Sequence, residues 1–530
     1  MKKSIALGAA LCTLLSVTTM SACTPAAQVD PIDDNYRVFY QIFVGSFSDS
    51  NGDGTGDLRG IINRMDYLND GNINSGKSLG VQGIWLSPIF KSPSYHKYDA
   101  ADYYQIDPKF GTQEDLEELI KICHERNVKV ILDLAINHTA KNNEWFVNFV
   151  NAHKKNDTKN EYYDYYTCVT SSTKVNGRTY YSLYNGSVEY YEGNFDSGMP
   201  ELNYDSQKVK DRMVDVAKHY LDLGIDGFRF DAIKYIYYND TPKSAEFWGW
   251  YMKELRKLKP DIYTVGECWS ADGEILEYYP AMNCFSFDTA QVSGMAATAV
   301  RGQIDVFARY VENFQKSAKA KNENSMYIPF LSNHDLDRAA GYFPTKQVTS
   351  DGNVEHPATI AANIYLLCSG SPFIYYGEEI GMKGARGSTN TDANRRLAML
   401  WGDGDTVRNP TGSTYNSEFQ INGTVADHLK DENSLMNYYA KLISLRNKYP
   451  QIARGNYKAL TPRTGCAGFV IEYNGEKTVL LHNVSTAAIE IDLTALSADV
   501  SAVADYIGQG KATVNGGKLT IEGETSVILK

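Results

Sequence analysis

Eight short runs of apolar, β-branched or aromatic residues recur along this chain, and stretches with helical periodicity separate them. The runs cover residues 38–44, 81–89, 128–136, 225–233, 262–269, 284–288, 326–335 and 371–380. Between the second and third runs, Thr112 precedes an acidic first turn, and leucine and isoleucine recur at helical spacing over 112–127. Strands that alternate with helices form parallel βα units, so eight of them predict an α/β fold with a closed (β/α)8 TIM barrel.

Two segments depart from this alternation. The stretch 139–205 is rich in tyrosine, asparagine and glycine and lacks helical periodicity, so we interpret it as a domain inserted after the third strand. From residue 452 the pattern changes to β-branched alternation, which predicts a C-terminal antiparallel β-sandwich over 452–530. The barrel itself is then expected to comprise 36–138 and 206–451.

The N-terminus has the layout of an export signal. Lys2 and Lys3 precede an apolar run that ends at "MSAC", so residues 1–22 are interpreted as a signal peptide. The ending on Cys23 resembles the lipobox of bacterial lipoproteins, which implies a lipid on Cys23, a tether over 23–35 and a membrane-anchored protein at the cell surface. Plain secretion is the alternative.

Charge and cysteine content narrow the possible partners. The formal net charge is -12 and no long basic cluster occurs, so nucleic acid is an unsuitable partner and a neutral ligand fits better. We expect a monomer. The cysteines beyond Cys23 are widely scattered and follow neither a disulfide pattern nor a zinc-ligand spacing, which predicts mostly free, buried thiols at positions 123, 168, 268, 284, 368 and 466.

Polar side chains gather at the carboxyl ends of the predicted strands. They are Asp133, Asn137, His138, Arg229, Asp231, Glu267, His334 and Asp335. In a barrel these ends form the face that holds active sites. Arg229 and Asp231 are two residues apart and therefore share one face of their strand. A structural salt bridge would explain that pair alone, but several acids on one rim repel one another, which favours function.

Five motifs carry a resemblance to a known family. They read "DLAINH" at 133–138, "MPELN" at 199–203, "GFRFDAIKY" at 227–235, "GECW" at 266–269 and "FLSNHD" at 330–335. In this order the motifs resemble the α-amylase family of retaining glycoside hydrolases, and the resemblance runs from Tyr36 to the C-terminus. It implies the same barrel, inserted domain and terminal sandwich.

The resemblance implies a catalytic trio. Asp231 corresponds to the nucleophile, Glu267 to the general acid and base, and Asp335 to the stabiliser of the transition state. Retaining glycosidases need one ionised carboxylate and one protonated carboxyl about 5 Å apart. A cation at Arg229 lowers the pKa of Asp231, whereas neighbouring carboxylates raise the pKa of Glu267.

Other positions match substrate-binding residues of that family. His138 and His334 correspond to ligands of sugar hydroxyls, and Lys234 corresponds to a lysine on the reducing side of the cut. Within 94–108 a further match implies a stacking platform and its pocket, formed by Tyr98, His96 and Asp99. Tyr235 replaces the usual histidine and puts the family's interdomain calcium site at Asn137 in doubt.

A second metal site is predicted at "DSNGDGTGD", residues 49–57. It places oxygen donors at alternate positions around Gly54, namely Asp49, Asn51, Asp53, the carbonyl of Thr55, and Asp57. Gly60 stands where an EF-hand has its glutamate, so this is no EF-hand. The corresponding loop in related family members binds calcium, which implies Ca²⁺ as the cofactor, and an ordinary turn is the alternative.

The motifs also indicate a substrate. "MPELN" resembles amylases intermediate between neopullulanases and oligo-1,6-glucosidases, and Ala232 resembles members that cut α-1,4 bonds. We therefore expect hydrolysis of starch and maltooligosaccharides. A 4-α-glucanotransferase and an α-glucosidase or oligo-1,6-glucosidase are alternatives on the same fold. A non-catalytic glucan-binding protein is a remote one, because all three carboxylates are present.

Overall fold

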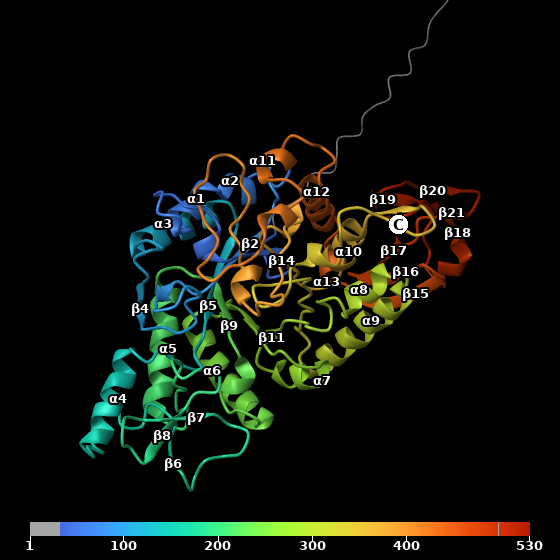
Figure 1. The fold of residues 1–530 in the computed structure, drawn as a ribbon. Helices are drawn as coiled ribbons and strands as arrows, with labels where there is room; N and C mark the ends of the chain where they lie inside the picture. The colour runs from blue at the N-terminus through green and yellow to red at the C-terminus, as the bar shows by residue number, and fades with distance from the viewer. Residues whose placement is uncertain (1–31, 497) are drawn as a thin grey trace, which may run out of the picture.

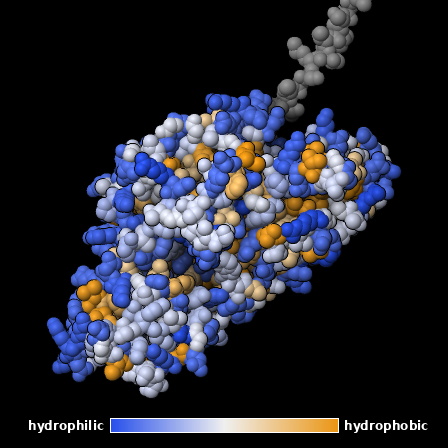
Figure 2. All heavy atoms as spheres, viewed as in Figure 1, coloured by the Kyte–Doolittle hydropathy of each residue, from blue (hydrophilic) through white to orange (hydrophobic). Residues whose placement is uncertain are grey.

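The computed structural model describes residues 32–496 and 498–530 (Figure 1). The predicted signal peptide and Cys23 lie outside these residues. Within them, every helix is too short or too polar to cross a bilayer. Hydrophilic residues cover most of the face in Figure 2, and hydrophobic ones form small separate patches there.

A parallel sheet forms the centre of the molecule. The last strand in the chain, β14 (Phe373–Tyr375), lies beside the first, β1 (Phe39–Ile42). From β1 the neighbours follow the order of the chain: β2 (Gly83–Leu86), β5 (Lys129–Leu134), β9 (Gly227–Phe230), β10 (Tyr263–Gly266) and β11 (Asn283–Cys284). All neighbouring pairs are parallel. Six of these strands lie within predicted runs, and β11 overlaps a seventh run, 284–288, at Cys284.

The remaining run, 326–335, closes the sheet without forming a regular strand. The amide of Ser286 donates to the carbonyl of Ile328 at 3.0 Å on one side, and Phe373 donates to Pro329 at 3.0 Å on the other. Phe330 adds an isolated parallel bridge to Phe373. Pro329 has no N–H to donate, which prevents a continuous ladder here. The barrel is confirmed, but its seventh strand is irregular.

Aromatic side chains fill the barrel. Phe39 and Phe373 stack with ring centroids 4.8 Å apart, and both pack with Trp85, Phe285 and Val265 in one buried cluster. Such filled layers make the interior a core and leave only the carboxyl ends of the strands for a site.

Helices cover the outside of the sheet (Figure 1). The longer ones are α3 (Gln113–Glu125), α5 (Gln207–Asp222), α6 (Thr241–Leu258), α9 (Ile304–Lys321), α10 (Pro357–Leu366) and α12 (Leu435–Lys448), and the shorter ones are α1 (Leu58–Asn63), α2 (Met65–Leu68), α7 (Asp272–Ile275), α8 (Met295–Val300), α11 (Val425–His428) and α13 (Pro450–Arg454). Thr112 and Asp115 form a capping box at the start of α3, as the sequence indicates.

The segment after β5 forms a small unit of its own. It contains α4 (Glu144–Lys154) and the antiparallel strands β6 (Cys168–Thr170), β8 (Glu189–Glu192) and β7 (Tyr180–Ser182), in that order across the sheet. The expectation that this segment lacks a helix is wrong. Trp145, Phe146 and Phe149 lie on the buried face of α4. A further short hairpin, β3 (Phe90–Lys91) and β4 (Asp102–Ile106), follows β2.

The C-terminal region is the predicted antiparallel sandwich. One sheet has the order β15 (Asn456–Arg463), β16 (Cys466–Tyr473), β17 (Glu476–Asn483), β22 (Thr525–Leu529) and β19 (Val503–Gly508). The other consists of β18 (Ile489–Asp492), β21 (Lys518–Ile521) and β20 (Ala512–Asn515). Val479, Leu481, Leu519 and Ile521 pack in one buried cluster. Figure 1 shows this region and the inserted segment on different sides of the barrel.

Gly227 begins the strand that carries Arg229, and we predict that it tolerates no side chain. A Cβ there would lie 1.8 Å from the carbonyl oxygen of Tyr263 on β10, so Gly227→Ala must push the two strands apart. The expected cost is about 1–3 kcal/mol or more of stability. Thermal unfolding measures it. The matched control is Gly249→Ala in α6, where a Cβ meets no atom within 4 Å and helix propensity favours alanine by about 1 kcal/mol. Equal unfolding temperatures for Gly227→Ala and the wild type would contradict this prediction.

Candidate active site

A cavity of about 670 Å³ opens at the carboxyl ends of the barrel strands. It is lined by side chains from the strand ends, from the loop before β4, from the inserted segment and from the loop after β14. The lining includes all three acids predicted as catalytic, Asp231, Glu267 and Asp335, together with Tyr95, His96, Tyr98, His138, Phe195, Lys234, Tyr235, Trp269, Asp392 and Arg396. The residues predicted from four separate motifs therefore meet at one place.

The buried guanidinium of Arg229 joins three carboxylates beneath this cavity. Its Nη1 donates at 2.7 Å to Asp133 Oδ1 and at 2.7 Å to Asp231 Oδ1. Its Nη2 lies 3.5 Å from Glu267 Oε2, a longer contact. Burial disfavours a charge on Arg229, yet these acids together raise its pKa well above the usual value, so the guanidinium is always protonated.

Glu267 lies in a different environment from Asp231. Burial raises the pKa of Glu267 to about 7, Asp231 and Asp335 add to the rise, and Arg229 opposes it. The backbone N–H of Ala232 donates to Glu267 Oε2 at 2.9 Å and fixes its orientation. Ala232 adopts the left-handed conformation, with φ of 49°, which few residues other than glycine do readily. The backbone after Asp231 is thus bent to bring this N–H to Glu267.

Asp335 has a cation of its own. Arg396 Nη2 donates to Asp335 Oδ1 at 2.6 Å, and Arg396 Nε donates to the carbonyl of His334 at 3.0 Å. Burial opposes ionisation, but His334, Arg396 and Arg229 hold the pKa of Asp335 well below its usual value. Asp335 is therefore a carboxylate, not a carboxylic acid, at neutral pH.

Tyr98 and His334 form one wall of the site. Their rings stack at 5.3 Å with planes 5° apart, and Gln41 Nε2 lies 2.7 Å from His334 Nδ1. An amide nitrogen can only donate, so Nδ1 accepts and Nε2 carries the proton of His334. The hydroxyl of Tyr98 lies 2.5 Å from this Nε2 and donates to Asp133 Oδ2 at 2.8 Å, which locks both rings in place.

His138 and His96 face the same cavity. His138 is buried, and its Nε2 has no hydrogen-bond partner among residues 32–496 and 498–530, so this nitrogen is available to a ligand in the cavity. Burial lowers the pKa of His138 and lowers that of His96 to about 4, so both imidazoles are neutral at pH 7. Neutral rings suit hydrogen bonds to an uncharged ligand such as a sugar.

Two predicted substrate residues occupy different places from the others. Asp99 is absent from the cavity lining, accepts from Ser92 Oγ at 2.8 Å and lies 3.9 Å from His96 Nδ1, so it supports His96 from behind. Lys234 lines the cavity, and its ammonium donates to the carbonyl of Trp269 at 2.8 Å. It therefore reaches a ligand beside Trp269, which is 44% exposed and stacks on Phe287.

Several members of the site were not predicted from the sequence. Arg396 and Asp392 lie in the loop after β14, which no motif marks, and Phe195 belongs to the inserted segment. Tyr95 lies within the matched segment 94–108, but only its neighbours Tyr98, His96 and Asp99 were predicted as site residues. Trp269 ends the "GECW" motif, so the sequence does carry a signal for this residue. Phe195 also packs on Tyr235 with centroids 4.7 Å apart, so the residue that departs from the family pattern is an aromatic contact of the cavity wall.

The loop 49–57 provides oxygen atoms in the predicted order. Asp49 accepts from the backbone N–H groups of Gly52 and Gly54 at 2.8 and 2.7 Å, and Asn51 accepts from Asp53 at 2.9 Å. Asp57 caps α1 through the N–H of Gly60 at 2.6 Å. Oxygen donors suit a hard cation such as Ca²⁺, so the donor set fits. The carboxylates nevertheless do not converge as closely as a group elsewhere in the described chain does.

The position of the family's interdomain calcium site, at Asn137, lies among side chains that already contact one another. Asn137 is buried, and its strand end contacts Glu201 through a bridge between His138 and Glu201. Asn194 Nδ2 donates to Glu201 Oε1 at 2.8 Å, and burial raises the pKa of Glu201 to about 8. Glu201 is thus held largely neutral by its surroundings.

Comparison with known proteins adds to this geometry. The family model for the α-amylase catalytic domain matches residues 41–455. Alpha-amylase 3 of Dictyoglomus thermophilum is 36% identical over 84% of this chain and 84% of its own. An oligo-1,6-glucosidase of Parageobacillus thermoglucosidasius is 31% identical over 79% and 84%. A 4-alpha-glucanotransferase of Thermotoga neapolitana is 29% identical over 84% and 95%.

Among solved structures, Amy13B of Eubacterium rectale superposes with a TM-score of 0.85 at 33% identity, over 95% of this chain and 97% of its own. The sequence match, the barrel and the carboxylates around Arg229 agree with one another. The chain belongs to the α-amylase family and is a glycoside hydrolase.

Proposed function

We propose that the chain hydrolyses α-1,4-glucosidic bonds of starch and maltooligosaccharides with retention of configuration. The observation that carries the proposal is that Arg229 lies closer to Asp231 than to Glu267. Its guanidinium contacts Asp231 at 2.7 Å and Glu267 at 3.5 Å. Asp231 is therefore the carboxylate that pairs closely with the cation, while Glu267, whose pKa burial raises to about 7, keeps a proton for the leaving oxygen.

The first half-reaction uses the two acids together. Asp231 attacks the anomeric carbon, while Glu267 protonates the glycosidic oxygen as the carbon–oxygen bond breaks. Asp335, ionised beside Arg396, lies at the same cavity and stabilises the positive charge that develops on the sugar ring. The product is a covalent ester between the glycosyl group and Asp231.

The second half-reaction restores the enzyme. Glu267, now ionised, removes a proton from a water molecule, which attacks the anomeric carbon and releases Asp231. A sugar hydroxyl could attack instead of water, which would make the chain a 4-α-glucanotransferase. This second candidate is favoured by the glucanotransferase of Thermotoga neapolitana among its relatives.

Substrate recognition in this proposal rests on neutral and aromatic side chains. Tyr98 provides a platform on the stacked pair with His334, and the free Nε2 of His138 binds a sugar hydroxyl. Trp269, 44% exposed, offers a second platform near Lys234. Ala232, beside the nucleophile, supports specificity for α-1,4 bonds. Cleavage of 1,6 bonds is the activity named for the oligo-1,6-glucosidase relative.

We also propose Ca²⁺ at the loop 49–57. Members of this family commonly bind calcium, and the loop places oxygen donors in the required order. Its role would be to stabilise the loop after β1, because these residues do not line the cavity of the catalytic acids. Calcium should raise the unfolding temperature of the wild type but not that of Asp49→Asn. An equal rise in both would contradict the assignment.

We further propose that the chain is exported, that a lipid on Cys23 holds it at the cell surface, and that it acts as a monomer. The support for export and for the lipid comes from Lys2, Lys3 and the apolar run before "MSAC". Membrane association that persists in Cys23→Ser would exclude the lipid anchor.

The pH dependence follows from Glu267. Because this group must be protonated in the first half-reaction, kcat/KM for maltoheptaose should fall about tenfold per pH unit once the pH exceeds about 7. α-Maltosyl fluoride needs no protonation of its leaving group and should show no such fall. An identical decline with both substrates would assign the ionisation to another residue.

Product analysis tests the proposed specificity. The chain without residues 1–22 is incubated with maltoheptaose, pullulan and isomaltose, and the products are followed over time. We expect short maltooligosaccharides from maltoheptaose and no release of glucose from isomaltose. Products longer than maltoheptaose would establish the glucanotransferase, and rapid cleavage of isomaltose would show that Ala232 does not set the linkage.

A further inference from the structure

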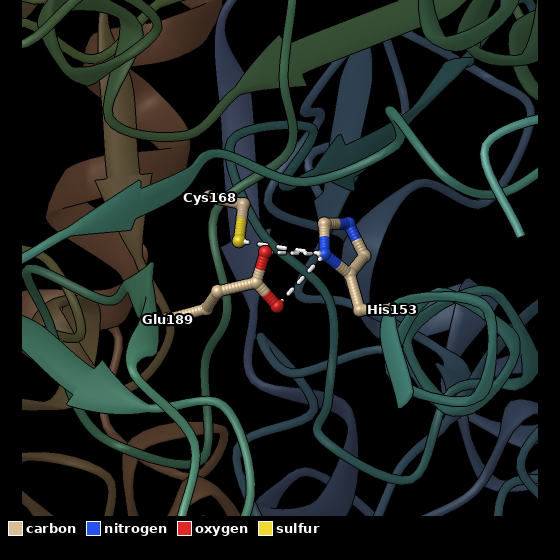
Figure 3. Close-up of side chains that lie close together, drawn as sticks. All are labelled: His153, Cys168 and Glu189. Atoms are coloured by element: carbon tan, nitrogen blue, oxygen red, sulfur yellow. Dashed lines mark hydrogen bonds and ion pairs between the residues drawn. The ribbon is translucent and has the colours of Figure 1, made fainter. Parts of the chain in front are cut away.

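Three side chains of the inserted segment point toward one another, apart from the active-site cavity (Figure 3). His153 lies in the last turn of α4, Cys168 begins β6 and Glu189 begins β8. In residues 32–496 and 498–530 they are the one group of three or more His, Cys, Asp or Glu residues whose ligand atoms all lie within 4.8 Å of one another. Neither the mechanism nor the predicted calcium loop uses them.

The distances from His153 to the other two side chains are close to those between the ligands of a tetrahedral ion. His153 Nδ1 lies 3.1 Å from each oxygen of Glu189 and 3.8 Å from Cys168 Sγ. An ion bound at about 2.0 Å to nitrogen and oxygen and about 2.3 Å to sulfur separates such ligands by roughly 3.3 and 3.5 Å. The two distances from His153 therefore differ from these separations by only a few tenths of an ångström, and all three ligand atoms lie within 4.8 Å of one another.

The orientation of His153 is fixed by its other nitrogen. Nε2 lies 2.9 Å from the carbonyl oxygen of Tyr163, which can only accept, so Nε2 carries a proton. The imidazole also stacks on the ring of Tyr163 at 4.1 Å with planes 6° apart. Metal-binding histidines commonly donate their second nitrogen to a backbone carbonyl in this way.

This arrangement leaves Nδ1 facing two acceptors. In a neutral imidazole the lone pair of Nδ1 would point at the carboxylate of Glu189, and two acceptors repel one another. Either a second proton on His153 or a cation between the residues removes the conflict. The side chain of His153 is 5% exposed, so a charged imidazolium there would be largely shielded from water. A thiol completes the group, which an ion pair between His153 and Glu189 does not require.

The donor set selects the kind of metal. Cysteine sulfur, imidazole nitrogen and a carboxylate oxygen together suit Zn²⁺ and related transition metals, whereas Ca²⁺ and Mg²⁺ prefer oxygen alone. Cys168 is not suited to act as a nucleophile instead, because burial raises the pKa of its thiol to about 12.

We propose that His153, Cys168 and Glu189 bind a divalent transition metal ion, with Zn²⁺ as the natural choice and one coordination position open to solvent. The ion joins α4 to β6 and β8, three elements that belong to the same inserted segment. Its role is to stabilise that segment. Binding replaces the proton of the Cys168 thiol by the metal, so one proton is released as the sulfur–metal bond forms.

Titration with Co²⁺ tests the site directly, because a cobalt–thiolate bond gives a charge-transfer band in the near ultraviolet. The reduced full chain is titrated in excess Ca²⁺, so that oxygen-only sites are filled. We expect the band to saturate at one ion per chain, Zn²⁺ to displace it, and Zn²⁺ to raise the unfolding temperature. Absence of the band in the folded chain would overturn the proposal.

Matched variants assign the ligands. Cys168→Ser should abolish the band, whereas Cys466→Ser, which alters a buried thiol of the C-terminal sandwich, should retain it. Glu189→Gln keeps the thiol and should weaken cobalt binding by more than about tenfold. If Cys168→Ser does not fold, Glu189→Gln still decides. A band that persists in Cys168→Ser, or affinity unchanged in Glu189→Gln, would contradict the assignment.

Discussion

The site depends on one buried charge. Arg229 is 0% exposed at the centre of the barrel, and a cation there is stable only if anions surround it. Arg229 Nη1 donates at 2.7 Å to Asp133 Oδ1 and at 2.7 Å to Asp231 Oδ1. The buried guanidinium of β9 is therefore bonded to a carboxylate of the adjacent strand β5. Arg229 Nη2 also lies 3.5 Å from Glu267 Oε2, so the same guanidinium helps to position Glu267.

A second arginine, Arg396, gives Asp335 a close cation that Glu267 lacks. Arg396 pairs with Asp335 at 2.6 Å, so two of the three carboxylates in the cavity have a close cation. Glu267 has instead a backbone N–H and burial, and its pKa rises to about 7. Three acids at one rim thus differ because their partners differ, and the left-handed backbone at Ala232 is part of the cause.

Sequence alone predicted the parts that depend on local pattern. Strand periodicity located the barrel, and the spacing of Arg229 and Asp231 placed both on one face. Sequence patterns did not predict contacts between residues that lie far apart in the chain. Nothing near Arg396 signals its contact with Asp335, 61 residues away. His153, Cys168 and Glu189 meet only through the fold of the inserted segment, and Pro329 interrupts a run whose apolar character still predicted a strand.

The central claim is that Asp231, hydrogen-bonded to Arg229 at 2.7 Å, forms the covalent bond to the sugar. The most direct test is mass spectrometry of Glu267→Gln after incubation with α-maltosyl fluoride, which can load the enzyme without an acid while release by water is slowed. We predict a stable increase in mass by one maltosyl group, located on the peptide that contains Asp231. An unmodified protein, or an adduct on another residue, would contradict the account.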